Sequence, residues 1–201
     1  MTPPSELATR VDGVLLAAGA GRRAGGPKGL RRDGSGVAWV RRCVEVLLDG
    51  GCDRVLVVVG AAGDEVAALL DDPRWPRRAD VVAVPCADWA VGMSASLAAG
   101  LRSVTADAAV VHLVDLPDVP AAAVARVLDH GGRTPDVLAR ATYEGRPGHP
   151  VLVGADHLAP LLATLEGDRG ARSYLDAHRA PGIECGDLAT GVDDDVPDVR
   201  A

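Results

Sequence analysis

The segment from Val11 to Lys28 constrains the fold of this chain more than any other stretch. It begins as an apolar run, VDGVLLAA, which predicts a buried strand, and it continues as a glycine-rich loop that carries Arg22, Arg23 and Lys28. Glycine lets a backbone turn tightly and approach a ligand closely. Exposed N–H groups beside this positive charge favour a polyanion, so we expect a nucleoside triphosphate here. The alternative interpretation is a basic surface loop without a ligand.

Two common phosphate-binding motifs compete for this loop, and neither fits it. A P-loop requires glycine before its lysine and Ser or Thr after it, whereas Lys28 follows a proline and precedes a glycine. The dinucleotide fingerprint fits formally from Gly19 to Ala24, but the Gly-Gly-Pro that follows would break the helix that must open there. The next predicted strand, Arg54–Val59, is followed by Gly60, and the acidic residue that the fingerprint requires at its end is missing. We therefore do not expect a dehydrogenase.

Apolar runs of strand length alternate with helical patterns along most of the chain. We expect strands at Val11–Ala17, Arg54–Val59, Asp80–Val84 and Ala108–Val114, and helices at about Val37–Leu48, Gly63–Leu70, Met93–Leu101 and Pro120–Leu128. Continuous runs such as VLVVV predict strands that are buried on both faces of a mostly parallel sheet. The segments DVLARATYEG and PVLVG then predict an antiparallel pair, and helices follow at about Ala155–Leu165 and Gly170–His178.

This pattern predicts one doubly wound α/β domain over residues 1–201, with a β excursion that forms part of a pocket and an extended or disordered N-terminus at about 1–9. The net charge of −7 argues against binding to nucleic acid or to a membrane surface. No apolar run is long enough to cross a bilayer and no signal segment is evident, so we expect a cytoplasmic protein. Its four cysteines lack CxxC spacing, which favours core thiols over metal ligands or disulfides.

Two further segments carry candidate site residues. Asp115 follows the fourth predicted strand, where a carboxylate faces the same crevice as the glycine-rich loop and can hold Mg²⁺ against phosphate oxygens. The alternative is an ordinary turn aspartate, and we expect Asp118 to cap the next helix. Gly92 precedes Ser94 and Ser96 at a helix start, where N–H groups and hydroxyls await partners, and we expect Ser94 to cap that helix.

The first loop resembles the signature of the molybdenum-cofactor nucleotidyltransferases, and of their cytidylyl branch in particular. That pattern is a strand ending in LAAG, then x-S-x-R-M-G-x-x-K, and this chain matches it at Leu16-Ala17-Ala18-Gly19, Arg23, Gly25 and Lys28. It departs at Gly21, where the family has serine, and at Ala24, where the family has methionine. Five motifs occur in the family's order, and the resemblance implies a Rossmann-like, glycosyltransferase-A-like nucleotidyltransferase domain.

The resemblance also implies which residues bind the two substrates. The nucleotide-binding set is Leu16, Ala17, Ala18, Gly19, Gly21, Arg23, Lys28, Gly92, Ser94, Ser96 and Asp115. Within it, Ser96 is expected to read the base edge, in a segment that extends to Gly100-Leu101. The motif GHPV, followed by GDxGAR, places Gly148, His149, Pro150 and Arg172 at the acceptor. His149 would hydrogen-bond the acceptor phosphate, and Arg172 would attract it or pair with Asp168; a structural histidine is the alternative.

The acidic run from Val192 to Asp198 resembles the family's closing D-I-D-T-P-E-D, whose acidic pair lies at the metal. The resemblance therefore implies that Mg²⁺ or Mn²⁺ is held by Asp115 and Asp195, with Asp193 as the alternative second ligand. A solvated acidic tail is the other interpretation.

The implied reaction transfers a cytidylyl group from CTP to the phosphate of molybdopterin and releases pyrophosphate, with Arg23, Lys28 and Mg²⁺ stabilising the leaving group. Its partners are CTP, a molybdopterin-type small molecule and a client molybdoenzyme. Three alternatives stay open. They are a guanylyltransferase of the same pathway, another sugar- or polyol-phosphate nucleotidyltransferase, and a non-catalytic cofactor carrier.

Overall fold

The computed structural model describes residues 9–22, 25–167 and 170–194. Its strands are β1 (Val11–Ala17), β2 (Arg54–Val59), β3 (Val81–Pro85), β4 (Ala108–Leu113), β5 (Leu138–Tyr143), β6 (Arg146–Gly154) and β7 (Gly182–Glu184). Its α-helices are α1 (Trp39–Asp49), α2 (Gly63–Leu70), α3 (Met93–Arg102), α4 (Ala121–Gly131), α5 (Ala155–Leu162) and α6 (Arg172–Ala177). Short 3₁₀ turns are η2 (Lys28–Leu30), η3 (Arg78–Asp80) and η4 (Trp89–Val91).

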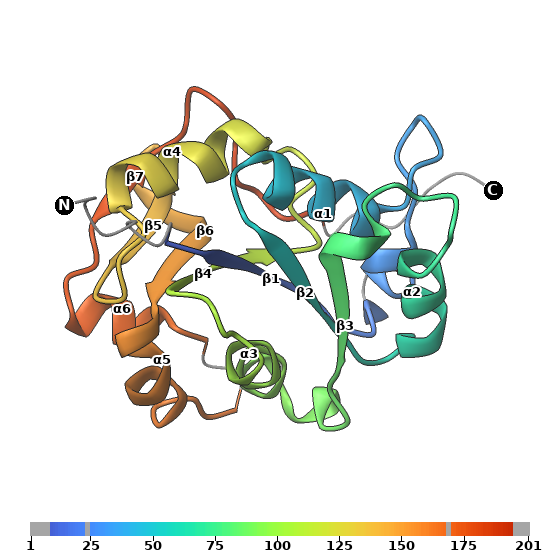
Figure 1. The fold of residues 1–201 in the computed structure, drawn as a ribbon, viewed down its shortest axis with the longest axis horizontal. Coiled ribbons are helices and arrows are strands. Elements are labelled where there is room, and N and C mark those ends of the chain that lie inside the picture. The colour runs from blue at the N-terminus through green and yellow to red at the C-terminus, as the bar shows by residue number, and fades with distance from the viewer. Residues whose placement is uncertain (1–8, 23–24, 168–169, 195–201) are drawn as a thin grey trace, which may run out of the picture.

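All seven strands form one twisted sheet in the order β3-β2-β1-β4-β6-β5-β7 (Figure 1). Strands β1 to β4 run parallel, which confirms the fold class predicted from their continuous apolar runs. The predicted antiparallel pair is also present as β5 and β6. It does not leave the sheet, because β6 pairs antiparallel with β4 and extends the sheet beyond it.

Helices cover both faces of the sheet, as the doubly wound pattern requires. In Figure 1, α1 and α4 lie above the sheet, and α3 and α5 lie below it. Strand β1 contributes to the core on both faces of the sheet. Leu15 packs in the cluster between the sheet and helices α1 and α4, and Val14 packs in the cluster between the sheet and α3. This alternation buries both faces of the central strand and fixes its register, since a shift by one residue would exchange the two faces.

Helix α3 lies unusually close to the sheet at Gly100. A Cβ atom at this position would come within 2.5 Å of Val14 Cγ1 and 2.9 Å of Val58 Cγ2. Gly100 and Leu101 are buried in this contact. Gly100 and Leu101, at the end of the segment predicted to contact the nucleotide, therefore hold the helix that carries the upstream serines against the sheet.

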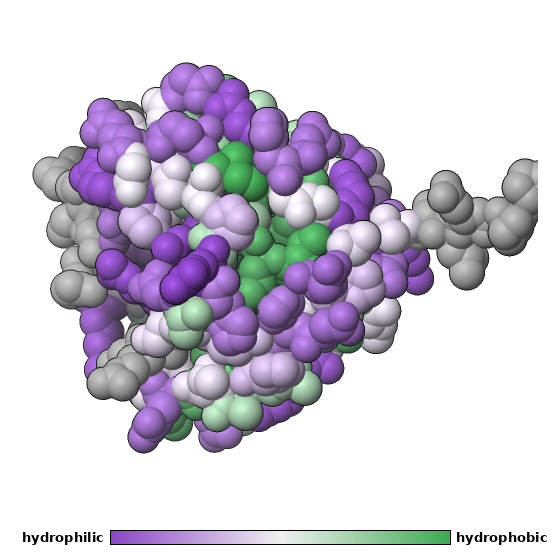
Figure 2. All heavy atoms as spheres, turned by 90° about the vertical axis from the view of Figure 1, so that its left-hand side faces the viewer, coloured by the Kyte–Doolittle hydropathy of each residue, from purple (hydrophilic) through white to green (hydrophobic). Residues whose placement is uncertain are grey.

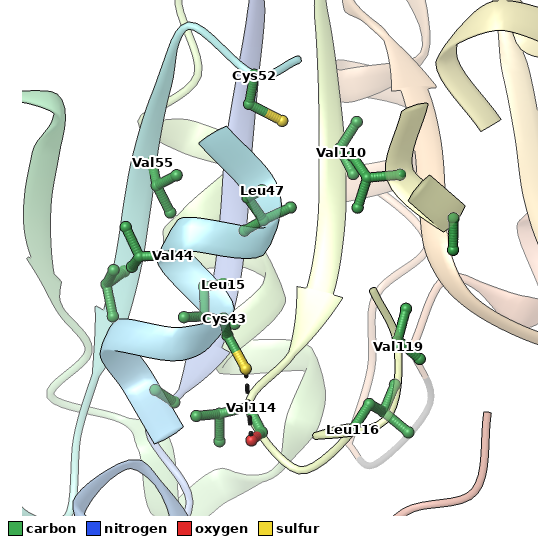
Figure 3. Close-up of a cluster of buried hydrophobic side chains, with 14 of the residues drawn as sticks. Leu15, Cys43, Val44, Leu47, Cys52, Val55, Val110, Val114, Leu116 and Val119 are labelled. Atoms are coloured by element: carbon green, nitrogen blue, oxygen red, sulfur yellow. Dashed lines mark hydrogen bonds between the residues drawn. The ribbon is translucent and has the colours of Figure 1, made fainter. Parts of the chain in front are cut away.

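The four cysteines are buried and free, as expected for core thiols. Cys43 lies on α1, and its Sγ is 3.8 Å from the carbonyl oxygen of Val114, the contact that Figure 3 marks. Burial raises the pKa of the Cys43 thiol to about 12, so this thiol stays protonated at neutral pH.

The surface on the β5, β7 and α6 side is largely polar, with a hollow that has apolar side chains at its base (Figure 2). Among the described residues, none of the helices combines the length and the apolar character that a bilayer crossing requires.

Candidate active site

A crevice of about 740 Å³ opens at the carboxyl ends of β1 and β4. The glycine-rich loop after β1, the start of α3, the segment after β4 and the Pro147–His149 segment of β6 all contribute to its walls. Of the residues predicted from sequence, those that line this crevice are Leu16, Ala18, Gly19, Gly21, Lys28, Gly92, Ser96, Asp115, Gly148 and His149. The predicted nucleotide and acceptor segments therefore share one cavity.

The remaining predicted residues lie elsewhere. Ala17 and Pro150 are buried and do not line the crevice. Ser94 is also buried, and its backbone N–H donates to the carbonyl oxygen of Gly167 at 3.2 Å. It does not cap α3, because that helix begins at Met93 and Gly92 occupies the cap position. Arg23 and Asp195 lie outside the described residues, as does Asp168, the predicted partner of Arg172.

Gly21 closes the glycine-rich loop in a conformation that only glycine adopts easily. Its φ is +56°, and its carbonyl oxygen accepts a 3.1 Å hydrogen bond from the N–H of Gly26. A Cβ atom at Gly21 would stand 1.8 Å from the Gly26 oxygen, far inside van der Waals contact. This approach gives a physical reason for the departure from the serine of the resembling family, since a serine would open the loop.

Lys28 and Asp115 form an ion pair in the floor of the crevice. Lys28 Nζ lies 2.9 Å from Asp115 Oδ2, and the two side chains are 12% and 23% exposed. Lys28 begins η2, and Asp115 follows the end of β4, so sheet topology brings together residues that are 87 positions apart. An ammonium and a carboxylate that are both shielded from solvent can pair with the opposite charges of one ligand, such as phosphate oxygens and a bound metal ion.

The C-terminal segment returns to this same place. The backbone N–H of Asp194 donates to the carbonyl oxygen of Asp115 at 2.9 Å, and Asp193 lines the crevice. The Asp194 carboxylate also lies 3.8 Å from Arg31. Residues 193 and 194 therefore contact the site directly, which contradicts a solvated tail for this part of the run.

Asp118 anchors that returning segment, and the expectation that it caps a helix is wrong. Its Oδ2 accepts hydrogen bonds from the N–H and the hydroxyl of Thr190, at 2.7 and 2.5 Å. The cap position of α4 belongs instead to Pro120. Asp118 thus ties residue 190 to the loop that also carries Asp115.

His149 is held as a neutral ring with one nitrogen engaged. Its Nδ1 lies 3.2 Å from the carbonyl oxygen of Val111, a contact in which the imidazole must donate. Burial lowers the pKa of His149, so the ring is uncharged at neutral pH. Its Nε2 is therefore left as a hydrogen-bond acceptor, which suits an N–H or O–H group of a ligand better than the fully ionised phosphate expected from the sequence.

A smaller cavity of about 210 Å³, called the side cavity below, adjoins the crevice. The two share Leu16, Met93 and the Pro147–His149 segment of β6 as walls. Arg140 and Arg172 line the side cavity, and both approach Asp176 of α6, at 2.7 and 4.0 Å. Arg172 thus lies next to the crevice and approaches Asp176, and its predicted pairing with Asp168 stays a prediction.

Comparison with known proteins places the chain in a family. The family model described as "MobA-like NTP transferase domain" matches residues 13–181. The chain belongs to this family. A curated relative, nicotine blue oxidoreductase of Paenarthrobacter nicotinovorans, is 36% identical over 198 residues and is covered over 92% of each chain.

Two solved structures show the same architecture. A nucleotidyl transferase from Methanothermobacter thermautotroptrophicus has 25% identity and a TM-score of 0.75, over 93% of this chain and 92% of the other. Rv0371C of Mycobacterium tuberculosis, solved as a complex with manganese, has 28% identity and a TM-score of 0.66, over 96% and 94%. The predicted nucleotidyltransferase class is confirmed, so this MobA-like protein is a nucleotidyltransferase enzyme.

The donor set of the MobA-like crevice fits a divalent cation that is bound partly by a nucleotide. The described residues contain no group of three or more His, Cys, Asp or Glu side chains that would hold a metal ion by themselves. Mg²⁺ commonly uses one or two carboxylates together with phosphate oxygens and water. Asp115 and Asp193 both line the crevice and supply that number.

Sequence reasoning missed two side chains of this site. Trp89 lines the crevice from η4, and its only sequence signal is its place just before the Gly92 turn. Arg140 lies in the middle of β5, in a segment read only as a strand. Alternation along β5 turns Arg140 away from the buried Ala139 and Ala141, toward the face covered by α6, and only the partner layer shows that a cavity lies there.

Proposed function

We propose that the protein transfers a cytidylyl group from CTP to the phosphate of a molybdopterin-type acceptor and releases pyrophosphate. The observation that carries this proposal is the convergence of Lys28, Asp115 and the acidic C-terminal segment beside the glycine-rich loop. An ammonium and carboxylates at one point suit a triphosphate bound with a divalent cation, because the ammonium pairs with phosphate oxygens and the carboxylates pair with the cation.

In the proposed reaction an oxygen of the acceptor phosphate attacks the α-phosphorus of CTP in line, and the bond to the bridging oxygen of pyrophosphate breaks. An ionised phosphate needs no deprotonation and the protein supplies no nucleophile, so its task is positioning and charge neutralisation. Lys28 and the loop N–H groups take up the charge that develops on the leaving pyrophosphate, and we place Arg23 beside them.

Asp115 and one C-terminal aspartate are the proposed ligands of Mg²⁺ or Mn²⁺, which would neutralise phosphate charge when bound. Asp195 is the preferred second ligand, and Asp193, which lines the crevice, is the alternative. The manganese complex of the related mycobacterial protein supports a divalent cation in this family.

The choice of CTP rests on the motifs LAAG and GHPV, which resemble the cytidylyl branch, whereas the guanylyl branch has LAGG. Ser96 is buried in the crevice wall near the start of α3 and is the proposed reader of the base edge. Trp89 on the same wall offers an indole on which a base can stack. Gly148, His149 and Arg172 then form the acceptor half of the site, with a client molybdoenzyme receiving the product.

A reductase is the second candidate function, because the relative that is 36% identical is named nicotine blue oxidoreductase. The loop geometry favours the first proposal. A dinucleotide fingerprint requires a helix that opens on its glycines, whereas the first α-helix after β1 begins only at Trp39. Within the described part of this loop, no residues form the usual helical cradle for the pyrophosphate of a nicotinamide cofactor.

The test compares both activities in one preparation. We expect acceptor-dependent pyrophosphate release from CTP, and much less from GTP, ATP and UTP, with Mg²⁺ or Mn²⁺ and molybdopterin present. Asp115→Asn should abolish this release, and Asp64→Asn, which alters an exposed aspartate of α2, should not. Oxidation of a reduced nicotinamide cofactor by nicotine blue, without pyrophosphate release, would support the reductase. Stoichiometric binding without either reaction would support a carrier.

A further inference from the structure

The side cavity has a chemical character that differs from that of the crevice. Its floor is the apolar face of the sheet, with Val111 of β4 and Val151 and Val153 of β6. Helices α3, α5 and α6 cover it with further apolar side chains, among them Leu97 and Leu161. A cavity lined in this way favours a flat apolar body over a sugar or a phosphate.

Positive charge lies at one place in that apolar wall. Arg140 and Arg172 line the cavity, and the described lining residues include no acid. Arg140 Nη1 lies 2.7 Å from Asp176 Oδ1, which fixes the guanidinium, and the Arg140 side chain is only 15% exposed. Asp176 faces both arginines, so among the residues that the structure describes here one carboxylate stands against two guanidinium groups.

Arg140 also has a buried donor to spare. Its Nε is shielded from solvent and has no hydrogen-bond partner among the residues that the structure describes. Leaving a buried N–H unsatisfied is unfavourable, so a ligand atom that accepts this hydrogen bond gains more than it would at the surface. Met93 and His149 line both the side cavity and the crevice, so the two spaces lie next to each other on either side of these side chains.

We propose that the side cavity binds a planar heterocyclic ring of the second substrate, and that Arg140 determines specificity by donating a hydrogen bond to an oxygen or nitrogen at the ring edge. Asp176 acts as the positioning residue that holds the guanidinium. This inference rests on the proposed function only in assigning the ring to the acceptor, whose phosphate would then extend past His149 into the crevice.

Two fluorescent probes of similar shape test the ring-edge hydrogen bond. Pterin-6-carboxylate has a bicyclic ring with oxygen and nitrogen at its edge, whereas 2-naphthoate has a bicyclic ring of similar size without them. We expect the intact protein to bind the pterin at least about tenfold more tightly than the naphthoate, the ratio typical of one good hydrogen bond to a charged group. Equal affinity for the two probes would overturn the proposal.

Arginine variants assign that preference to one side chain. Arg140→Met should remove the preference for the pterin and leave naphthoate binding within about twofold, since a hydrogen bond is lost and apolar area is kept. Arg126→Met is the matched control, because Arg126 also pairs with an aspartate, Asp187, but lies on α4 away from the cavity. Equal loss of both probes in Arg140→Met would show a structural role and overturn the proposal.

A third variant keeps the test decisive if Arg140→Met does not fold by circular dichroism. Arg140→Lys retains the charge that faces Asp176 but has no Nε–H, so it should fold and still lose the preference for the pterin. An unchanged preference in Arg140→Lys would overturn the proposal. The binding assay contains no nucleotide. Failure of CTP turnover would therefore reject the proposed function alone, and equal binding of the two probes would reject the ring subsite alone.

Discussion

Lys28 and Asp115 show how single residues prepare the crevice for a charged ligand. Each compensates the other at 2.9 Å while both are largely shielded from solvent. An isolated charge in this position would be costly, and the ion pair offsets that cost without closing the crevice. A triphosphate with its cation can compensate both charges at once, because phosphate oxygens can pair with the ammonium and the cation can pair with the carboxylate.

We expect Lys28→Ala to lower turnover by about a hundredfold or more, because removing one positioned charge from developing anionic oxygens costs about 3–4 kcal/mol of barrier. Pyrophosphate release by a variant with unchanged circular dichroism measures this loss. Lys28 is also the only lysine of the chain, so lysine-directed acetylation followed by mass spectrometry reports on this site alone. Bound CTP should protect Lys28, and near-normal turnover or absent protection would contradict the assignment.

His112 presents the opposite case, a polar group with no compensation. It is fully buried on β4, and neither ring nitrogen has a partner among the described residues. Burial lowers the pKa of His112 from 6.5 to about 3. Between these two values the unfolded chain binds a proton that the folded protein excludes, so the free energy of unfolding falls as pH falls through this window.

We expect His112→Leu to raise the free energy of unfolding by about 1–2 kcal/mol at pH 7, because an unsatisfied buried group is replaced by an apolar one of similar size. Urea titrations at pH 7 and pH 5 check this expectation. The loss of stability between the two pH values should be smaller in the variant than in the parent protein. A variant that is less stable at pH 7 would show that His112 has a favourable partner.

Gly21 limits which loop the chain can build. We expect Gly21→Ser to lower turnover, although it restores the residue of the resembling family, because the new Cβ would collide with the Gly26 oxygen at 1.8 Å. Pyrophosphate release compared with Gly34→Ala measures the effect. Gly34 is a suitable control because a Cβ there meets nothing within 4 Å. Higher activity in Gly21→Ser would mean that the loop tolerates the serine.

At the scale of elements, the active crevice depends on a C-terminal segment that is not part of the sheet. Thr190 is tied to Asp118, and Asp194 is tied by its backbone to Asp115. These contacts join the C-terminal segment to the loop after β4. The segment supplies Asp193 to the crevice wall, so its anchoring positions one of the proposed cation ligands.

We therefore expect Asp118→Ala to raise the Mg²⁺ concentration that gives half-maximal turnover by about tenfold, which corresponds to about 1.4 kcal/mol of lost positioning. Thermal stability should change little, because both contacts are exposed. Asp129→Ala, an exposed aspartate on α4, is the control. An unchanged Mg²⁺ requirement in Asp118→Ala would show that the anchoring of the C-terminal segment does not affect cation binding.

The sequence predicts best the elements that have a strong local pattern of apolar residues. The apolar runs of β1 and β2 predicted the observed bounds of both strands, because continuous Val and Leu residues between glycines and charged residues are typical of a buried strand. The three-residue β7 has no such period and was not predicted. Asp118 was misread as a cap because its partner Thr190 lies 72 positions away, and a contact of that span leaves no trace in local sequence.

At the scale of the whole molecule, sheet topology assembles the site. The order β2-β1-β4-β6 brings the loop after β1, the segment after β4 and the Pro147–His149 segment of β6 around one crevice. Parallel strands place β1 and β4 with their carboxyl ends together, where ligands bind in open α/β sheets. The antiparallel β6 begins at that same edge, so its first residues and not its last ones face the crevice. The order of the motifs predicted that these segments share one site. That Arg140 lines a cavity could be recognised only from the packing of the helices against the sheet.

Cytidylyl transfer sends the α-phosphate and the γ-phosphate of CTP into different products, so following both phosphates tests the proposed reaction directly. Molybdopterin and the protein are incubated with CTP labelled either at the α-phosphate or at the γ-phosphate, with Mg²⁺ present. We expect the α label to appear in the acceptor product and the γ label to appear in pyrophosphate, in equal amounts. Transfer of the γ label to the acceptor, or retention of both labels in CTP while labelled GTP reacts, would contradict the proposed reaction.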